Sequence, residues 1–341
     1  MSEESGRFVL HIGTPKTGTT FVQGILAQNR RELVEAGWSY PGKRLNQQHA
    51  VYGLCGSDIY HIEDASPYED LARSMADRVQ ADLARGRRVM VSAETLAALD
   101  DDAVERLIGR LAVPDRIVMT LRGLPSLLPS IWQQLLKTGK TETLPEMIER
   151  SAGHRDDSTP VWNAYVFGDV VRRWSRWAPV HVAVVPSRDS TDGRSLWDLF
   201  SEAADVPEVS DTSVPASDAN VSLSHEGARL LQQMNIEIRD SGVSRERARR
   251  LRRWYLKHAV FPLAGGADGG GRITLPKESE ELVTSWNEQQ LQMLQEHATA
   301  VHGDLDDARR IPGHRPVDGD GEMRTVAARQ MIRMLQDSAA E

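Results

Sequence analysis

Two kinds of hydrophobic pattern alternate along this chain. Short, continuous apolar runs predict buried strands, and they fall at residues 9–12, 88–92, 116–121 and 180–185. Longer segments with apolar residues three or four positions apart predict helices, at about 69–85, 100–111, 124–137 and 161–177. A short strand bounded by turns is expected at 37–41, whereas residues 44–68 show no clear periodicity. Strands separated by helices predict the α/β class, with a parallel sheet flanked by helices on both faces.

The chain contains no repeat at a fixed period, and we expect one domain over residues 1–302, followed by a C-terminal segment over 303–341. Within that segment, residues 303–321 are charged and contain Pro and Gly, which is typical of a linker. Apolar positions over 323–335 predict a short amphipathic helix that packs on its own domain or on a second subunit of a homodimer.

The strand at 9–12 leads through a turn of small residues into a helix that opens at Phe21. This geometry directs backbone N–H groups and a helix start toward an anion. Gly13 and Gly18 have the spacing of a Walker A loop, G-x-x-x-x-G-K-[ST], but Thr19 stands where the lysine belongs. The lysine is instead Lys16, inside the turn. This displacement shifts the interpretation from nucleotide hydrolysis toward transfer of another group from a nucleotide.

The run Pro15-Lys16-Thr17-Gly18-Thr19-Thr20-Phe21 resembles the 5′-phosphosulfate loop of the sulfotransferases that use 3′-phosphoadenosine 5′-phosphosulfate (PAPS). That loop has the form P-K-[ST]-G-T-T followed by an aromatic residue. The resemblance implies a P-loop-like sulfotransferase fold and a lysine, Lys16, that contacts the bridging and sulfuryl oxygens. It also implies that Phe21 lies near the adenine and that the 5′-phosphate is held by Thr17, Gly18, Thr19 and Thr20.

A second motif fits the same family. The 116–121 strand is followed directly by Arg122, and Ser130 lies eight residues further on, in the next helix. A guanidinium at a strand end and a hydroxyl on the next helix can bind one phosphate from two sides; in the family this is the 3′-phosphate of the nucleotide. The family resemblance also suggests Arg272, which ends a glycine-rich loop, as a third contact, although that loop equally fits an ordinary surface segment.

Two residues depart from the family pattern of this second motif. Gly123 replaces the usual acidic residue or asparagine, and Pro129 falls inside the expected helix.

The candidate general base is Glu94, which follows the 88–92 strand. A carboxylate beside a partly desolvated site can accept the proton of an acceptor hydroxyl, and bacterial and glycan-modifying relatives have a glutamate nearby. The alternative is a glutamate that only stabilises a helix dipole. His49 is the second candidate base, because it lies in the irregular polar segment expected to meet the acceptor, whereas His11 on the first strand is expected to be structural.

Composition narrows the class of protein. The chain has 341 residues and a net charge of −8, which does not favour nucleic acid as a partner. The single cysteine, Cys55, rules out an internal disulfide and suits a reducing compartment. The polar, acidic N-terminus and the lack of a long apolar run lead us to expect a cytoplasmic protein without a membrane span. Abundant arginine and alanine are typical of a bacterial chain, and no metal-binding motif is present.

The expected acceptor is a hydroxyl of a carbohydrate, a glycolipid or a small natural product. Segments 40–68 and 153–165 suit a polar ring through the side chains of Tyr40, His49, Tyr52, His61, His154, Trp162 and Tyr165. Two other classes of function remain open, namely a P-loop kinase or NTPase and a non-catalytic nucleotide-binding protein. The last would be favoured if Lys16 and Glu94 did not face the same site.

Overall fold

The computed structural model describes residues 6–56, 62–153, 164–187, 189–191, 193–213, 222–261 and 273–313. Contacts between residues divide the chain into two compact units. The first unit contains residues 1–124, 154–215 and 284–310, and the second contains residues 125–153, 216–283 and 311–341.

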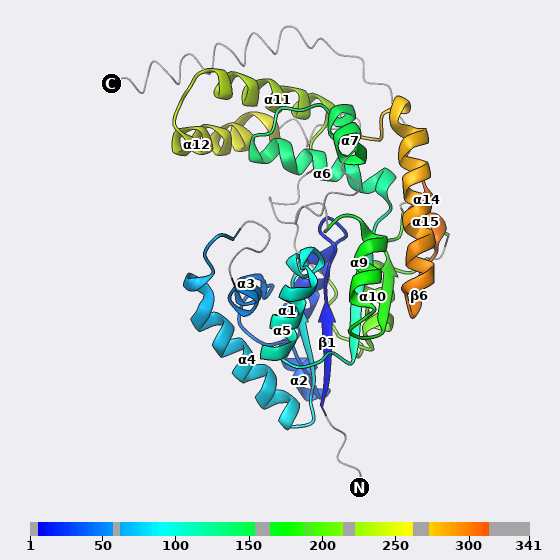
Figure 1. Ribbon diagram of the computed structural model, residues 1–341. Coiled ribbons are helices and arrows are strands. Elements are labelled where there is room, and N and C mark those ends of the chain that lie inside the picture. The colour runs from blue at the N-terminus through cyan, green and yellow to red at the C-terminus, as the bar shows by residue number, and fades with distance from the viewer. Residues whose placement is uncertain are drawn as a thin grey trace. The chain divides into compact units, whose positions relative to one another are not determined.

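The core of the first unit is a six-stranded sheet in which every pairing is parallel, with the strand order β2-β3-β1-β4-β5-β6 (Figure 1). The strands are β1 (Arg7–His11), β2 (Trp38–Ser39), β3 (Arg88–Ser92), β4 (Arg116–Leu121), β5 (Val180–Val184) and β6 (Ala300–His302). The central strands are apolar almost throughout, because helices cover both faces of a parallel sheet. The expected α/β class with a parallel sheet is therefore confirmed.

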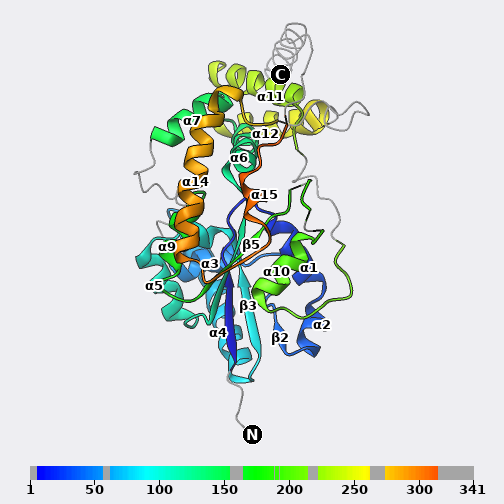
Figure 2. The same ribbon diagram turned by 90° about the vertical axis from the view of Figure 1, so that its right-hand side faces the viewer.

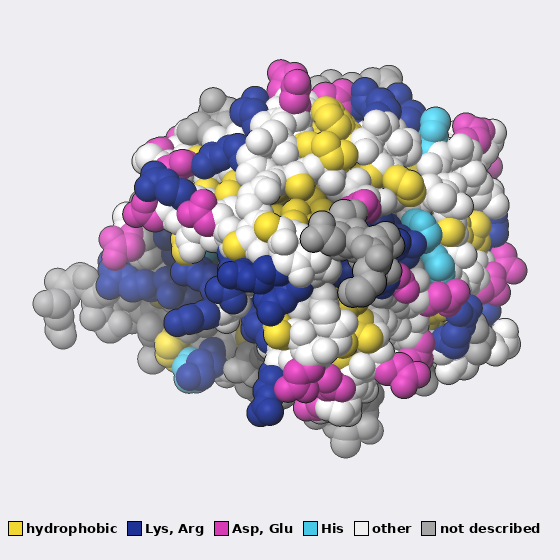
Figure 3. Space-filling model, turned by 90° about the horizontal axis from the view of Figure 1, so that it is seen from below, with side chains coloured by type: hydrophobic (Ala, Val, Ile, Leu, Met, Phe, Trp, Pro, Cys, Tyr) yellow, Lys and Arg dark blue, Asp and Glu magenta, His cyan; other side chains and the backbone are white. Residues whose placement is uncertain are grey.

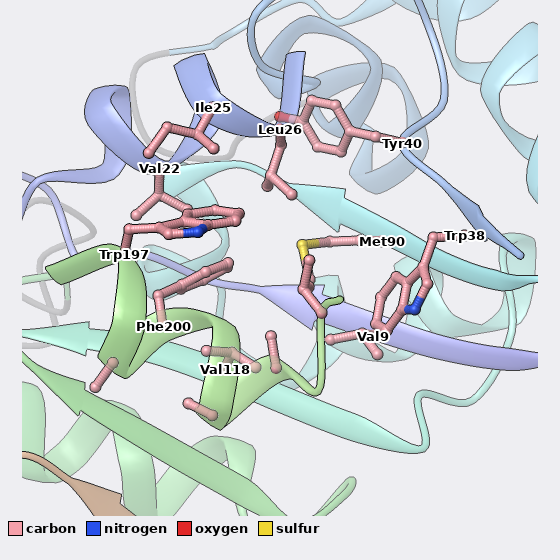
Figure 4. Packing of buried hydrophobic residues seen from close by; sticks show 14 of the residues in the cluster. Val9, Val22, Ile25, Leu26, Trp38, Tyr40, Met90, Val118, Trp197 and Phe200 are labelled. Carbon is pink, nitrogen blue, oxygen red and sulfur yellow. The ribbon is translucent and has the colours of Figure 1, made fainter. Parts of the chain in front are cut away.

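One face of the sheet is covered by α1 (Thr19–Gln28), α2 (Arg30–Glu35) and α10 (Leu196–Ala204) (Figure 2). Figure 4 shows the core on this face, where Trp197 and Phe200 of α10 lie beside side chains of α1 and above the strands. The strands contribute the side chains of Val9, Met90, Val118 and Ala183 to this cluster.

The opposite face is covered by α3 (Gln48–Cys55), α4 (Glu69–Ala84), α5 (Asp101–Arg110) and α9 (Phe167–Trp174) (Figure 2). Short helical turns, η1 (Ser66–Tyr68) and η2 (Glu94–Ala98), precede α4 and α5. The first unit also contains α15 (Leu305–Arg309) and most of α14 (Glu280–His297). Helix α3 was not expected, because it lies in the segment without clear periodicity.

The second unit is helical. It contains α6 (Leu124–Thr138) from its second residue, α7 (Leu144–Gly153), α11 (His225–Asp240) and α12 (Arg245–Tyr255). A π-helical turn, η4 (Leu256–Val260), and a 3-10 turn, η5 (Lys277–Ser279), complete it. Asn235 joins α11 to the end of α6 by donating to the carbonyls of Leu136 and Lys140 at 2.8 and 2.9 Å.

Several sequence expectations fall wholly or partly outside the described residues. These include the start of the 161–177 helix, of which the structure describes α9, and the helix at 323–335. Among the helices that the structure describes, none combines the length and the apolar character needed to cross a membrane.

Candidate functional site

The turn after β1 lies where the chain connections of the sheet diverge. Strand β1 has β3 on one side and β4 on the other, so the chain leaves β1 toward one edge and later crosses to the other. Ligands of open α/β sheets bind at the carboxyl ends of the strands at such a point. Backbone hydrogen bonds fix the turn to β4, from Ile12 N to Val118 O (3.0 Å) and from Thr120 N to Gly13 O (2.6 Å).

The turn has the backbone form of an anion-binding nest. Lys16 and Gly18 have φ of 67° and 84°, whereas Thr17 between them is not in the left-handed region. Such alternation directs successive N–H groups toward one point. A side chain at Gly18 would be strained by its φ of 84°, and a Cβ atom there would lie 2.4 Å from Leu196 Cδ2, so the leucine side chain would have to move. The backbone of the turn therefore favours glycine at this position.

Helix α1 begins at Thr19, directly after this turn, and Gly18 is its N-cap residue. Among the described side chains, none caps the start of α1, and its first turn holds no acidic residue. The first N–H groups of a helix lack partners within the helix and carry a partial positive charge. The start of α1 and the preceding turn together therefore suit an anionic group.

Two hydroxyl groups of the motif form hydrogen bonds within the protein. Thr17 is buried, and its Oγ1 lies 2.5 Å from both the Thr14 carbonyl oxygen and Thr120 Oγ1. The Thr19 hydroxyl donates to Glu94 Oε2 at 2.9 Å. These residues can therefore offer a phosphate their backbone N–H groups, while their side chains hold the turn to β4 and to η2.

Lys16 is half-buried within the turn. Burial lowers the pKa of its ammonium group, the nearby charge of Glu94 raises it, and Arg122 lowers it again, with a net shift below the ordinary value. Among the described residues, no side chain forms a hydrogen bond or ion pair with this ammonium group. Lys16 therefore carries a partly desolvated positive charge that an anion would stabilise.

The structure brings Glu94 to the same turn. Glu94 is the first residue of η2, directly after Ala93, whose N–H donates to the His11 carbonyl of β1 at 3.1 Å. The backbone of Glu94 lies so close to Gly13 that a Cβ atom there would be 3.0 Å from Glu94 Cα. With the Thr19 contact and the electrostatic interaction with Lys16, this places the Glu94 carboxylate beside the loop.

Arg122 also lies at the loop. It follows β4, and its Nη1 donates to the Lys16 carbonyl at 3.4 Å, a long contact. The next residue, Gly123, packs against α15, where a Cβ atom would lie 1.7 Å from the carbonyl oxygen of Ala308. This contact explains why position 123 is occupied by a glycine.

The remaining residues expected to contact the nucleotide do not all lie at the loop. Ser130 lies half-buried on α6 in the second unit, in a helix that continues through Pro129. Phe21 is half-buried and packs against the core beneath α1, and Pro15 is buried in the turn. Arg272 lies outside the described residues.

His49 does not lie among the loop contacts. It is on α3, where its ring stacks on Tyr68 with 5.1 Å between centroids and its Nδ1 contacts Arg44 Nη1. Tyr52, one turn further along α3, is buried; burial is the largest cause that raises its pKa, and the charge of Glu94 raises it further.

Three of the residues expected to contact the acceptor are corrected. Tyr40, Tyr52 and Tyr165 are buried, so none of their rings is open to a ligand. The Tyr40 hydroxyl donates to the Leu45 carbonyl at 2.7 Å. His61, His154 and Trp162 lie outside the described residues.

A buried polar network beneath the loop was not anticipated from the sequence. Ser92 Oγ accepts a hydrogen bond from Gln23 Nε2 (3.0 Å) and forms a second hydrogen bond with His11 Nδ1 at 2.7 Å. Gln47 Oε1 accepts from Ser92 N at 2.8 Å. Burial lowers the pKa of His11 to about 3, so its ring is neutral at pH 7. His11 is therefore structural, as expected, and the network fixes the end of β3 just before Glu94.

Within the described residues, no group of three or more His, Cys, Asp or Glu side chains is placed to hold a metal ion. Cys55 is buried, and burial raises the pKa of its thiol to about 12, so it is not a reactive nucleophile.

Comparison with known proteins leaves the family undetermined. No family model matches the chain, and no curated protein and no solved structure matches it. The fold and the geometry of the site therefore carry the functional argument.

Proposed function

We propose that this protein is a PAPS-dependent sulfotransferase that moves the sulfuryl group to a hydroxyl of a carbohydrate, glycolipid or small natural product. The proposal depends above all on one observation. The half-buried Lys16 ammonium lies in the turn before the uncapped start of α1, within electrostatic reach of both Glu94 and Arg122.

These groups fit the charges of the donor. The nest and the start of α1 suit the 5′-phosphate, while Lys16 suits the oxygen that bridges phosphorus and sulfur. Arg122 is assigned to the 3′-phosphate, and the family resemblance alone implies Ser130 and Arg272 as further contacts. Phe21 is assigned to the adenine.

The proposed reaction is an in-line displacement at sulfur. The acceptor oxygen forms a bond to sulfur while the bond between sulfur and the bridging oxygen breaks. Glu94 takes the acceptor proton, and Lys16 neutralises the charge that develops on the departing phosphate oxygen. The products are a sulfate ester and 3′-phosphoadenosine 5′-phosphate. Because a sulfuryl group carries less charge than a phosphoryl group, Lys16 can supply the neutralisation without a magnesium ion.

The site supports the two alternatives less well. A P-loop kinase or NTPase needs a lysine where Thr19 stands, and the Thr19 hydroxyl donates to Glu94 instead. A non-catalytic nucleotide-binding protein does not require a carboxylate beside the lysine, yet Glu94 and Lys16 interact electrostatically.

A labelling experiment separates the three functions. The purified protein is incubated with ³⁵S-labelled PAPS or with γ-³²P-labelled ATP, each with a panel of hydroxyl acceptors, and Lys16→Ala serves as the inactive control. Transfer of ³⁵S by the wild type alone supports the proposal. Transfer of ³²P would establish a kinase instead, and nucleotide binding without any transfer would support the non-catalytic alternative.

A further inference from the structure

A second candidate site lies away from the nucleotide loop. A groove of about 890 Å³ separates one face of α4 from the segment that joins β2 to α3. Its volume lies within the range of about 300–1,000 Å³ that is usual for small-molecule sites. Pro41, Ala50 and Met75 contribute apolar surface, so the groove suits an organic molecule better than a bare ion.

The groove carries more positive than negative charge. Two carboxylates, Asp70 and Asp77, line it, and Asp82 is buried behind it. Five cationic side chains line it, namely Lys43, Arg44, Arg73, Arg78 and Arg85. Even when Asp82 is counted, an excess of two positive charges remains.

Two of the five cationic side chains, Arg78 and Arg85, contact Asp82. The side chain of this residue is 1% exposed, and one carboxylate oxygen accepts from Ser39 Oγ at 2.6 Å. Three guanidinium groups share this carboxylate, with N–O distances of 2.8 Å for Arg87 and 3.4 Å for both Arg78 and Arg85. Arg87 therefore compensates the buried charge, and the other two keep donors for a ligand.

Arg78 and Arg85 are placed to use those donors. Their side chains are 65% and 62% exposed and both line the groove. Arg78 lies on α4, and Arg85 directly follows the end of this helix, three residues before β3 begins. Figure 3 looks onto the molecule from below, and Lys and Arg side chains gather there in a band.

We propose that this groove binds an organic anion with two or more negative charges, through Lys43, Arg78 and Arg85. Guanidinium groups recognise phosphate and carboxylate groups through paired N–H donors, which defines the ligand class. The site is separate from the nucleotide loop, because neither the turn nor Glu94 nor Arg122 lines the groove. It therefore does not depend on the proposed sulfotransferase activity.

Calorimetric titration with a hexose bisphosphate at low ionic strength tests this proposal. The double variant Arg78→Gln/Arg85→Gln should weaken binding at least roughly tenfold, since two charge-assisted contacts are lost. The matched control is Arg31→Gln, which removes an exposed arginine that pairs with Glu35 on α2, outside the groove. Lys16→Ala should leave this binding unchanged, which excludes binding at the nucleotide loop.

The double variant is expected to fold as the wild type does. Ser39 and Arg87 still contact Asp82, and the two deleted arginines are exposed, so its thermal midpoint should stay close to that of wild type. Unchanged affinity in the double variant would refute the proposal. Loss of binding in Lys16→Ala would assign the bisphosphate to the loop instead. Equal affinity for a hexose monophosphate would contradict the charge count.

Discussion

Replacement of Glu94 by glutamine tests the assignment of the general base most directly. The Glu94 carboxylate accepts a hydrogen bond from Thr19 and lies within electrostatic reach of Lys16 and Tyr52. A glutamine keeps the shape and an oxygen that accepts from Thr19, but it cannot take a proton from a hydroxyl group. It also removes the negative charge that raises the pKa of Lys16.

The structure gives the size of the effect on stability. A hydrogen bond to a charged group contributes about 1.5–3 kcal/mol and a neutral one about 0.5–1.5 kcal/mol, so Glu94→Gln should cost about 1 kcal/mol. For a chain of 341 residues, that lowers the Tm by only about 1–2 °C. Loss of the general base should lower turnover by about 10²–10⁴-fold. The two effects are therefore well separated.

The assay is ³⁵S transfer at saturating donor, with calorimetric donor affinity and the thermal midpoint as controls. His49→Ala is the matched variant, because His49 stacks on Tyr68 and lines the groove, and it should cost far less turnover. A larger loss in His49→Ala than in Glu94→Gln would transfer the role of base to His49. If neither variant loses turnover, the acceptor is acidic enough to need no base, and an alcohol acceptor is refuted.

Three further predictions concern charged groups. Arg122→Ala should weaken binding of 3′-phosphoadenosine 5′-phosphate by about one to two orders of magnitude, measured by calorimetry, and equal wild-type affinity for ADP would refute the 3′-phosphate assignment. Lys16→Ala should lower kcat far more than product-nucleotide affinity, and a chelator should leave the wild-type rate unchanged; a strict magnesium requirement would contradict this mechanism. Burial raises the pKa of Asp82, but Ser39 and Arg87 outweigh it and hold the pKa below the ordinary 3.8. Its stabilising contribution is therefore complete above that value and lost as the pH falls below it, so urea unfolding of Asp82→Asn should depend less on pH below about pH 4 than that of wild type.

Strands β1, β3, β4 and β5 could be predicted from the sequence because both faces of the sheet are buried, whereas the three-residue strand β6 was not predicted. β3 and β4 occupy the expected ranges, since strands of this kind read as continuous apolar runs. The helix at 100–111 was visible from its acidic start, and Asp100 caps α5 by accepting from Ala103 N at 2.8 Å.

Helix α3 could not be predicted, because burial removes the pattern by which a helix is recognised. Six of its eight residues are buried against neighbouring elements, so the helix has no broad polar face and shows no periodic pattern. Gly53 allows the close approach of α4, because a Cβ atom there would lie 2.5 Å from the Tyr68 carbonyl oxygen and 2.8 Å from Ala72 Cβ. That fit between helices has no local sequence signal.

The candidate site was predictable in its position and not in its hydrogen bonds. Glu94 could be placed from the order of the chain, because β3 pairs directly with β1 and the carboxyl ends of parallel strands share one edge. The partner of the Thr17 hydroxyl is Thr120, which is 103 positions away in the sequence. The spacing within the loop therefore predicts an anion site but does not distinguish hydroxyls that would contact the anion from those that hold the turn.

The position of Lys16 within the turn bears on the charge of the ligand that the loop would favour. A lysine at the Walker A position would project from the helix start, whereas Lys16 is held within the turn by backbone in the left-handed region. Burial destabilises its ammonium group in the free protein, and Glu94 offsets only part of this cost. A bound anion would supply the remaining compensation, so that anion binding and protonation of Lys16 would favour each other. For the proposed donor, the displaced lysine would therefore favour negative charge inside the turn.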